Sequence, residues 1–317
     1  MDFRSLCQFL VLSVPLAAAR PYSGAAHGVS PRQDTGSLPR PALGSIPYGP
    51  DIRACNVPGQ VALTFDDGPG PYTSQLLDIL DSNNVKATFF ICGNNGQGDI
   101  STPGSAWPAI VQRMHNAGHQ IGSHTYTHPD LSTLSPEDQR ANIVENERAL
   151  TSILGFFPTY LRPPYTSCGE SCASTLAALG YHQVRPFCTY NSFLPRRRSS
   201  IHTRLTQLTT PLPPCRFPSL TRAPPQANYN IDTLDWEGDY DAARSRFSAA
   251  LAGGNPAAAG FISLAHDIHE RTVTELAKYL IDEARARGYD LVTMGECLGD
   301  PVANWYRDPT TGGSWMS

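Results

Sequence analysis

The chain has 317 residues, with 24 Lys plus Arg against 28 Asp plus Glu and a formal net charge of -4. This length suits one large domain, since α/β barrels of roughly 200 to 250 residues form a single unit. The slightly acidic balance provides no basic surface for nucleic acid or an anionic membrane. We therefore expect an uncharged or mildly basic partner and no nucleic acid.

The N-terminus is predicted to be a secretory signal peptide over residues 1–19. It contains Arg4, then an apolar stretch over 6–16, then three alanines at 17–19, which is the layout of a cleaved export signal. The stretch is too short to span a bilayer, and no other part of the sequence approaches the length of a membrane span. We expect a secreted monomer, extracellular or associated with a cell wall. A buried N-terminal helix is the alternative.

Residues 20–53 are rich in Pro, Gly, Ser and Ala and carry no periodic apolar pattern. Such a composition buries too little apolar surface to fold, so we predict a disordered leader there. The folded domain is expected over 54–300, with a tail over 301–317.

Apolar runs of the β type alternate with helical patterns through this domain. The runs are Val61–Phe65, Ala87–Ile91, Gln120–Gly122, Thr159–Leu161, Tyr181–Val184, Phe261–Ala265 and Tyr289–Val292. Strands that alternate with helices form parallel βα units. We predict an α/β fold, a distorted (β/α) barrel of about seven parallel strands with its active site at the C-terminal strand ends; an open wound sheet is the alternative.

Two helices can be placed from the sequence. Apolar residues recur at three- and four-residue steps from Val273 to Ala284, and this stripe ends at Gly288. Ser135-Pro136, followed by two acidic residues, predicts a helix start with proline at the first helical position. Both helices are scaffold, because the chemistry of a parallel barrel gathers where strands end and the following loops begin.

The predicted strand ends are unusually polar. The first strand ends in Asp66 and Asp67, and the Gly-Pro-Gly-Pro sequence that follows prevents the strand from continuing. The other polar or aromatic residues in such places are Ser123, His124, His128, Arg162, Tyr165, Asp235, Trp236, His266 and Asp267. All of them are expected at one edge of the barrel.

His124 and His128 lie four residues apart in GSHTYTHPDL. Imidazoles at this spacing can face one ion, and with one carboxylate they form a set of two histidines and one acid that leaves positions open for water and substrate. The histidine pair alone is weak evidence, because surface and core histidines show the same spacing. The acid pair at a strand end strengthens the metal interpretation.

Five segments in order carry a resemblance to a known family: TFDDGP, SHTYTHPDL, RPPYTSC, DTLDW and ISLAHDIH. They resemble the motifs of the polysaccharide deacetylase family with the NodB homology domain (carbohydrate esterase family four), in particular its secreted fungal chitin deacetylases. The resemblance covers residues 55–300. It implies a hydrolase that removes N-acetyl groups from chitin or N-acetylglucosamine oligomers and gives chitosan and acetate.

The resemblance also implies a metal centre. Asp67, His124 and His128 would hold a divalent metal ion, preferably zinc, although cobalt or nickel also suits these ligands. Asp66 would be the general base, oriented by Arg162. Alternatively, Arg162 forms an ordinary salt bridge at the surface.

The remaining implied roles concern the leaving group and the acetyl group. His266 would be the general acid, tuned by Asp235. The backbone N–H of Tyr165 would stabilise the oxyanion, and Trp236 and Leu264 would form an apolar wall around the acetyl methyl. Alternatively, Trp236 is an ordinary core residue.

The eight cysteines fit an oxidising compartment. Cys7 leaves with the signal peptide, so seven remain and one thiol is expected to be free. Cys55 and Cys297 bracket the domain and are candidates to join its two ends, while Cys168 and Cys172 are close enough for a local loop. The sequence leaves the connectivity open.

Residues 184–226 depart from the family pattern. They have no amphipathic period, many prolines and a basic run at Arg196–Arg198, and structureless loops of this length argue against an ordinary domain segment. One interpretation is a surface loop closed by a Cys188–Cys215 disulfide. The other, which we favour, is a retained intron whose removal joins LGYHQ to ANYNIDTLDW and leaves Cys92 as the free thiol.

Other functions use some of the same residues. An O-acetyl esterase acting on xylan would need the same metal and carboxylates. A catalytically weak wall-binding homologue is expected to have lost a metal ligand or the base, yet all of them are present. A glycosidase with Asp66 and Asp67 as its acid pair is disfavoured, because that mechanism needs carboxylates about 5 to 10 Å apart on opposite sides of the bond.

Overall fold

The computed structural model describes residues 34–185 and 230–316. Its strands are β1 (Asp51–Ile52), β2 (Gln60–Asp66), β3 (Thr88–Ile91), β4 (Gln120–Ser123), β5 (Phe157–Pro158), β6 (Tyr160–Leu161), β7 (His182–Val184), β8 (Asn230–Asp232), β9 (Phe261–His266), β10 (Asp290–Val292) and β11 (Tyr306–Arg307). Its α-helices are α1 (Thr73–Ser82), α2 (Trp107–Asn116), α3 (Pro136–Leu154), α4 (Glu170–Ala178), α5 (Tyr240–Ala252), α6 (Ala277–Ala286) and α7 (Met294–Leu298). Strands and helices alternate along most of the chain, as the sequence predicts.

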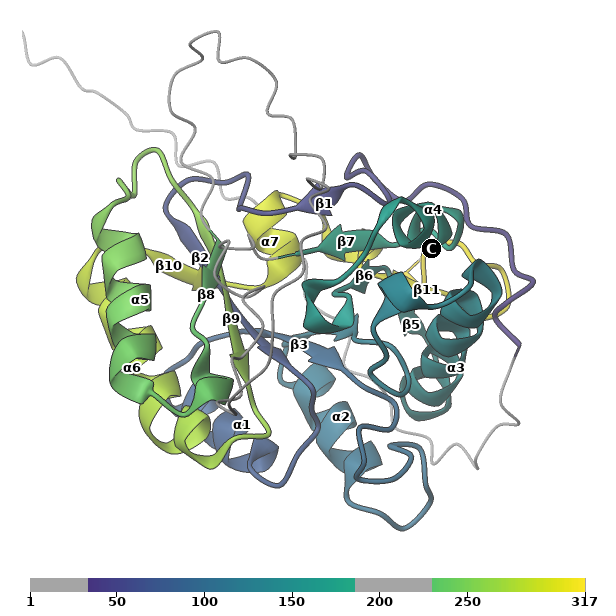
Figure 1. The fold of residues 1–317 in the computed structure, drawn as a ribbon, viewed down its shortest axis with the longest axis horizontal. Coiled ribbons are helices and arrows are strands. Elements are labelled where there is room, and N and C mark those ends of the chain that lie inside the picture. Colours follow the sequence, from purple (N-terminus) through teal and green to yellow (C-terminus); the bar gives the residue numbers. More distant parts are fainter. Residues whose placement is uncertain (1–33, 186–229, 317) are drawn as a thin grey trace, which may run out of the picture.

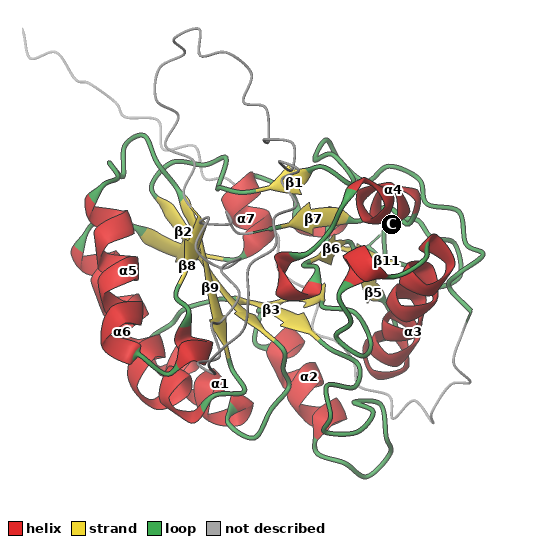
Figure 2. Ribbon diagram, in the orientation of Figure 1, coloured by secondary structure: helices red, strands yellow, loops and turns green. Residues whose placement is uncertain are grey.

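Parallel pairing joins nine of these strands into one curved sheet, and the helices surround it (Figures 1 and 2). The strand order is β1-β7-β6-β4-β3-β2-β9-β8, and β10 pairs with the beginning of β2. Within the described ranges, β8 and β1 are the two edges and do not pair with each other. The predicted distorted barrel is therefore confirmed, with two more strands than the seven predicted. The additional strands, β1 and β8, contain one apolar residue each and therefore produce no apolar run.

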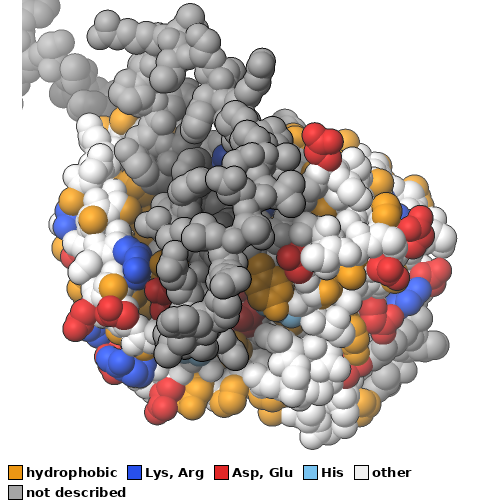
Figure 3. Space-filling view, in the orientation of Figure 1, with side chains coloured by type: hydrophobic (Ala, Val, Ile, Leu, Met, Phe, Trp, Pro, Cys, Tyr) orange, Lys and Arg blue, Asp and Glu red, His pale blue; other side chains and the backbone are white. Residues whose placement is uncertain are grey.

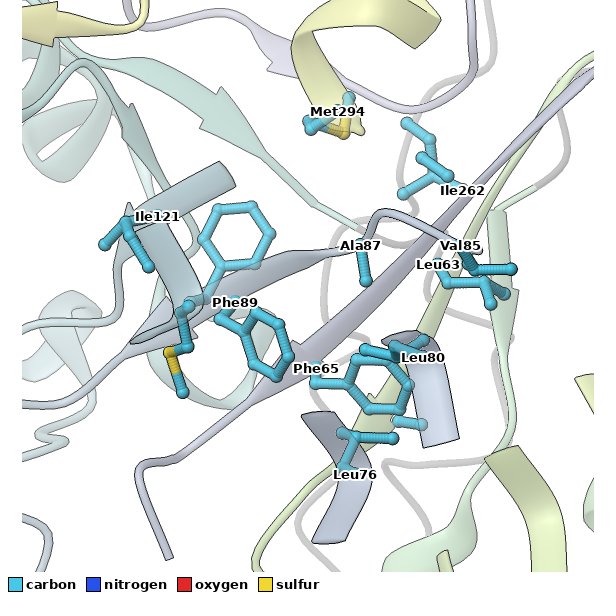
Figure 4. Close-up of a cluster of buried hydrophobic side chains, with 14 of the residues drawn as sticks. Leu63, Phe65, Leu76, Leu80, Val85, Ala87, Phe89, Ile121, Ile262 and Met294 are labelled. Atoms are coloured by element: carbon cyan, nitrogen blue, oxygen red, sulfur yellow. The ribbon is translucent and has the colours of Figure 1, made fainter. Parts of the chain in front are cut away.

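The centre of the sheet is buried on both sides. In β2, every residue from Val61 to Asp66 is buried, so both faces of the strand are covered. Figure 4 shows Phe65 beside Phe89 of β3, with Leu76 and Leu80 of α1 packed against them. The two rings stack with their centroids 5.6 Å apart. This packing fixes β2, the strand that ends in the acid pair.

Helix α3 begins as predicted. The Ser135 hydroxyl accepts a hydrogen bond from the backbone N–H of Asp138, Pro136 is the first helical residue, and Gly155 ends the helix with a left-handed φ of 83°. The predicted helix over 273–284 begins with a π-helical turn, Thr272–Leu276, and continues as α6. The turn follows directly on the loop after β9, which carries His266.

From residue 34 onward, the predicted leader lies in contact with the domain. Arg40 forms a buried ion pair with Glu147 of α3, with 2.9 Å between its Nη2 and Oε2, and the Thr35 hydroxyl donates to the same carboxylate. Arg307 donates to the carbonyl of Pro41 and to the hydroxyl of Tyr48. Side-chain hydrogen bonds hold this segment, and such bonds leave no amphipathic period in the sequence.

The predicted tail also belongs to the fold, because β11 pairs antiparallel with β5. Several predictions concern residues outside the described ranges: the signal peptide over 1–19, the leader up to 33, and the insertion from 186 onward with Cys188, Cys215 and Arg196–Arg198. Val184, the first residue of the predicted insertion, lies within the described range and is the last residue of β7. None of the helices among the described residues has both the length and the apolar character that a membrane span requires.

Two disulfides join the cysteines that the sequence named as candidates. Cys55 pairs with Cys297 across 242 residues, and Cys168 pairs with Cys172 across 4 residues. Among the cysteines that the structure describes, Cys92 is free and buried. The long-range disulfide ties the entry to β2 to helix α7, near the end of the domain.

The two disulfides are expected to differ in their effect on stability. A cross-link stabilises mainly by restricting the unfolded chain, and the chain-entropy relation gives about 5 kcal/mol for the 242-residue separation and about 2 kcal/mol for the 4-residue one. We predict that Cys55→Ala/Cys297→Ala lowers the free energy of unfolding clearly more than Cys168→Ala/Cys172→Ala. Urea unfolding of both double variants measures this. Equal losses would contradict the entropic origin.

Candidate active site and metal centre

The strand ends bring the predicted polar residues together, because parallel strands end at the same edge of the sheet. Asp66 is the last residue of β2 and pairs in register with His266, the last residue of β9. On the other side of β2, β3 and β4 lead to Ser123, and His124 follows directly. Arg162 follows β6, and its backbone N–H donates to the carbonyl of Ser123.

Asp67, His124 and His128 form one cluster whose possible ligand atoms all lie within 4.8 Å of one another. The Oδ1 atom of Asp67 is 3.3 Å from Nε2 of His124 and 3.1 Å from Nε2 of His128. Ligand atoms held by one tetrahedral zinc ion at about 2.1 Å are roughly 3.4 Å from each other. The two distances from the carboxylate to the imidazoles are therefore close to those between ligands of one ion.

The protonation pattern of the cluster also fits a metal ion. Nδ1 of His124 lies 2.6 Å from the carbonyl oxygen of Arg162, so Nδ1 carries the proton and Nε2 presents a lone pair to Asp67. The buried Oδ1 of Asp67 receives no hydrogen bond from the described residues. A carboxylate oxygen without a hydrogen-bond donor and an imidazole nitrogen that presents a lone pair both suit a divalent cation.

Two of the three cluster residues, and one residue in the loop between the histidines, have unusual backbone conformations. Asp67 has a φ of 75° and His128 a φ of 55°, and Thr125, in the loop that joins the two histidines, has a φ of 69°. The left-handed region costs about 1 to 2 kcal/mol for a residue with a Cβ atom. Strain of this kind concentrates at functional sites, where surrounding contacts enforce it.

Asn142 of α3 provides such contacts for the histidine loop. Its Oδ1 accepts hydrogen bonds from the backbone N–H groups of Tyr126 and Thr127, at 2.8 and 3.2 Å, and its Nδ2 donates to the Thr127 hydroxyl at 2.8 Å. The loop is therefore fixed to a helix on the residue directly before His128.

Asp66 is held by a buried arginine. Nη1 of Arg162 lies 2.7 Å from Oδ1 of Asp66 and 2.6 Å from the Thr64 hydroxyl, and the guanidinium lies over the ring of Phe90 at 4.3 Å. Arg162 is 1% exposed, so the alternative of a surface salt bridge is wrong. The second oxygen of Asp66, Oδ2, is 3.8 Å from Nε2 of His124. One carboxylate oxygen is thus anchored, and the other faces the cluster.

His266 and Asp235 form a second buried pair. Nδ1 of His266 lies 2.7 Å from Oδ1 of Asp235, and the other oxygen accepts the backbone N–H of His266 at 2.8 Å and the Thr272 hydroxyl at 2.6 Å. Burial alone lowers the pKa of His266, but the hydrogen bond and charge of Asp235 reverse this effect and raise the pKa to about 9. His266 is therefore a cation at neutral pH, with its Nε2–H available as a proton donor.

Of the three residues expected at the substrate, Tyr165 and Trp236 lie in segments that follow strands, and Leu264 lies within β9. Tyr165 is 67% exposed, has a left-handed φ of 55°, and its ring meets that of His128 edge-on at 4.6 Å. Trp236 is 51% exposed on the short helix Asp235–Glu237, so it is not a core residue. Leu264 is buried in β9 and pairs in register with Asp232 of β8.

Several residues that support the site were not identified from the sequence. Thr64 could have been found, because it lies two positions before Asp66 on one strand and therefore on the same face. Asn142 and Thr272 come from helical segments and carry no motif that points to the site. On the face drawn in Figure 3, acidic and basic side chains of the described residues are interspersed around the rim.

Comparison with known proteins places the chain among polysaccharide-modifying proteins. The family model "Polysaccharide deacetylase" matches residues 53–184. A chitin deacetylase of Pestalotiopsis sp is 42% identical over 266 residues, which cover 83% of this chain and 72% of that protein. A chitin deacetylase of Colletotrichum lindemuthianum is 37% identical over 266 residues, covering 83% and 88%. The solved structure of the chitin deacetylase from this fungus superposes with a TM-score of 0.66 over 83% of this chain and 97% of the other.

The pKa of His266 provides a direct test of the second pair. We predict that Asp235→Asn lowers this pKa from about 9 to the ordinary histidine value near 6.5 or below, because burial then acts without an opposing carboxylate. A pH titration of the imidazole signals by NMR measures the change. A pKa that stays near 9 in the variant would show that Asp235 is not its cause.

Proposed function

The chain belongs to the polysaccharide deacetylase family, and on this basis we propose that it removes N-acetyl groups from chitin or N-acetylglucosamine oligomers, giving chitosan and acetate. The chain is a hydrolase of amide bonds in polysaccharides. Two relatives that are each covered over more than two thirds of their length are described as chitin deacetylases, which supports chitin as the substrate. We further propose that residues 54–300 form the catalytic domain of a secreted protein, consistent with its disulfides.

The observation that carries this proposal is the cluster of Asp67, His124 and His128 beside the anchored Asp66. We propose these three residues as the ligands of a divalent cation, zinc by preference. When bound, such a cation supplies Lewis acidity, which lowers the pKa of water from near 16 to about 7 and polarises a carbonyl group.

Side chains and backbone groups of the protein then carry out the proton transfers and stabilise the developing charge. Asp66 accepts a proton from the attacking water through its Oδ2, while Arg162 holds Oδ1 and so orients the carboxylate. The water oxygen bonds to the carbonyl carbon of the acetamide. The backbone N–H of Tyr165 donates to the oxygen on which negative charge develops.

His266 completes the hydrolysis. Its Nε2–H protonates the sugar nitrogen as the carbon–nitrogen bond breaks, so acetate and a free amine leave. Asp235 stabilises the imidazolium before this transfer and holds the ring through Nδ1. Leu264 and Trp236 contribute apolar surface beside the acetyl methyl. The raised pKa of His266 keeps the acid in its proton-donating form at neutral pH.

Metal dependence is the central test. We predict that purified protein releases acetate from N-acetylglucosamine oligomers, that a chelator abolishes this release, and that added zinc restores it. Asp67→Asn is expected to lose both zinc binding and activity, because the cluster loses its only anionic ligand. Asp290→Asn is the matched control, because it makes the same change at an exposed position that is not part of the cluster.

Asp66→Asn separates the base from the metal. It is expected to retain zinc while the turnover number falls by about 10² to 10⁴, the usual contribution of a positioned acid or base. Activity that survives complete removal of metal, or an active Asp67→Asn variant, would contradict the proposed chemistry.

An O-acetyl esterase acting on xylan is the second candidate, because the same residues can hydrolyse an ester. We predict that acetate release from N-acetylglucosamine oligomers exceeds that from acetylated xylan under equal conditions. The reverse order would keep the metal mechanism but replace the substrate. A wall-binding homologue with little activity would release acetate from neither.

A further inference from the structure

Two buried residues next to the metal cluster take no part in the proposed proton transfers. Asp267 follows His266 and is fully buried, and its Oδ1 accepts no hydrogen bond from the residues that the structure describes. Thr73, the first residue of α1, is equally buried. Burying a carboxyl group costs free energy unless the group is hydrogen-bonded or paired with a charge.

Thr73 links Asp267 to the loop that carries Asp67. Its hydroxyl donates to Oδ2 of Asp267 at 2.5 Å and accepts the backbone N–H of Gly70 at 2.7 Å. Gly70 lies three residues after the metal ligand Asp67. The hydroxyl thus donates one hydrogen bond and accepts another. These two bonds connect the loop to Asp267, which follows the end of β9.

The loop also rests directly on the Asp267 segment. A Cβ atom at Gly68 would lie 2.4 Å from both carboxylate oxygens of Asp267, and one at Gly70 would lie 2.9 Å from Cγ2 of Ile268. Both positions therefore require glycine. The carboxylate of Asp267 fills the space beneath Gly68, the residue that directly follows Asp67.

On its other side, the loop is held from β3. The backbone N–H of Cys92 donates to the carbonyl of Gly68 at 3.0 Å, and Nδ2 of Asn95 donates to the carbonyl of Asp67 at 3.4 Å. Both hydrogen bonds are to carbonyl groups of the Asp67–Gly68 segment, in which Asp67 has its φ of 75°. The Thr73 hydroxyl supports the same loop from the β9 side.

We infer that Asp267 and Thr73 are positioning residues that hold the backbone of Asp67 in its left-handed conformation, so that its carboxylate meets the two imidazoles. They form a brace, defined here as the Asp267–Thr73–Gly70 hydrogen-bond chain. The inference rests on the proposed metal cluster. Residues that orient metal ligands affect metal affinity by about 10- to 100-fold, and the brace acts through the ligand's backbone instead of through its side chain.

The test compares two threonine substitutions in the purified protein. Thr73→Val keeps the shape and removes the hydroxyl; Thr88→Val does the same at the start of β3, where the Thr88 hydroxyl accepts the backbone N–H of Met294 at 2.8 Å. Both threonines are fully buried and each accepts one backbone N–H, so Thr88→Val is the matched control. Zinc dissociation constants are measured by competition with a chromophoric chelator, alongside thermal melting without metal.

We expect both valine variants to melt below the wild type, whereas only Thr73→Val weakens zinc binding, by about tenfold or more. Thr73→Ser keeps the hydroxyl and is expected to bind zinc within about threefold of the wild type. If Thr73→Val binds zinc as tightly as Thr88→Val does, the brace is overturned. If the wild type itself binds no zinc, the metal cluster falls and the brace falls with it.

A double-mutant cycle tests whether Thr73 and Asp267 act together. Once Thr73→Val has removed the donor, Asp267→Ala is expected to weaken zinc binding less than it does in the wild-type background. Strictly additive effects of the two substitutions would assign Asp267 a separate role and overturn the brace.

Discussion

A buried carboxylate oxygen that faces two imidazole nitrogens is the constraint on which the site depends. Oδ1 of Asp67 lies close to Nε2 of both His124 and His128, and no hydrogen bond from the described residues satisfies it. An unsatisfied buried acceptor costs about 1 to 3 kcal/mol, and the left-handed ligand residues add to that cost. The protein retains this unfavourable arrangement because β2, packed on both faces, is rigid enough to enforce it.

The balance of charge explains why a cation suits this arrangement. Asp66, Asp67 and Asp235 are acidic and largely withdrawn from water, whereas Arg162 and the protonated His266 supply the opposing positive charge. The acidic groups outnumber the basic ones, so the residues alone leave a negative potential at the strand ends. A divalent cation reverses the sign and makes the site attractive to the electron-rich oxygen of an amide.

The fold and most of the site were predictable from local signals. Strand ends can be recognised where an apolar run meets Gly and Pro, as after Phe65, and the rule that parallel strands end at one edge brings Asp66, His124, Arg162 and His266 together. The five motifs assigned a role to each residue. The edge strand β1 leaves no such signal, since its sequence, Asp-Ile, contains a single apolar residue.

Residues that act across long sequence distances could not be predicted in this way. Glu147 on α3 binds Arg40 and Thr35, more than 100 residues earlier, so a segment without any apolar pattern packs against the domain. Likewise, Asn142 and Thr73 carry no distinctive motif, and their use depends on which loop the tertiary fold brings to them. Propensity describes a segment's neighbours in sequence, whereas these contacts depend on neighbours in space.

The acid pair shows how one short segment provides two different environments. In a regular strand, adjacent side chains point to opposite faces of the sheet, so Asp66 and Asp67 could not both approach one ion. Asp66 remains in β2 and faces the same side as Thr64, where Arg162 binds both. Asp67 leaves the strand with a φ of 75°. As a result, carboxylate oxygens of both residues approach Nε2 of His124, at 3.8 Å for Asp66 and 3.3 Å for Asp67.

The reversal at Asp67 is therefore what separates the two roles. An extended Asp67 would turn its carboxylate away from the histidines and leave Asp66, already bound to Arg162, as the nearest acid. The guanidinium would then compete with a cation for the same carboxylate, so that this carboxylate could neither bind the cation nor accept a proton efficiently. Because the backbone turns at Asp67, the first acid stays paired with arginine while its Oδ2 faces the cluster, as the proposed role of general base requires. Among the described residues, the contacts of the second acid are with the two histidines and not with an Arg or Lys side chain.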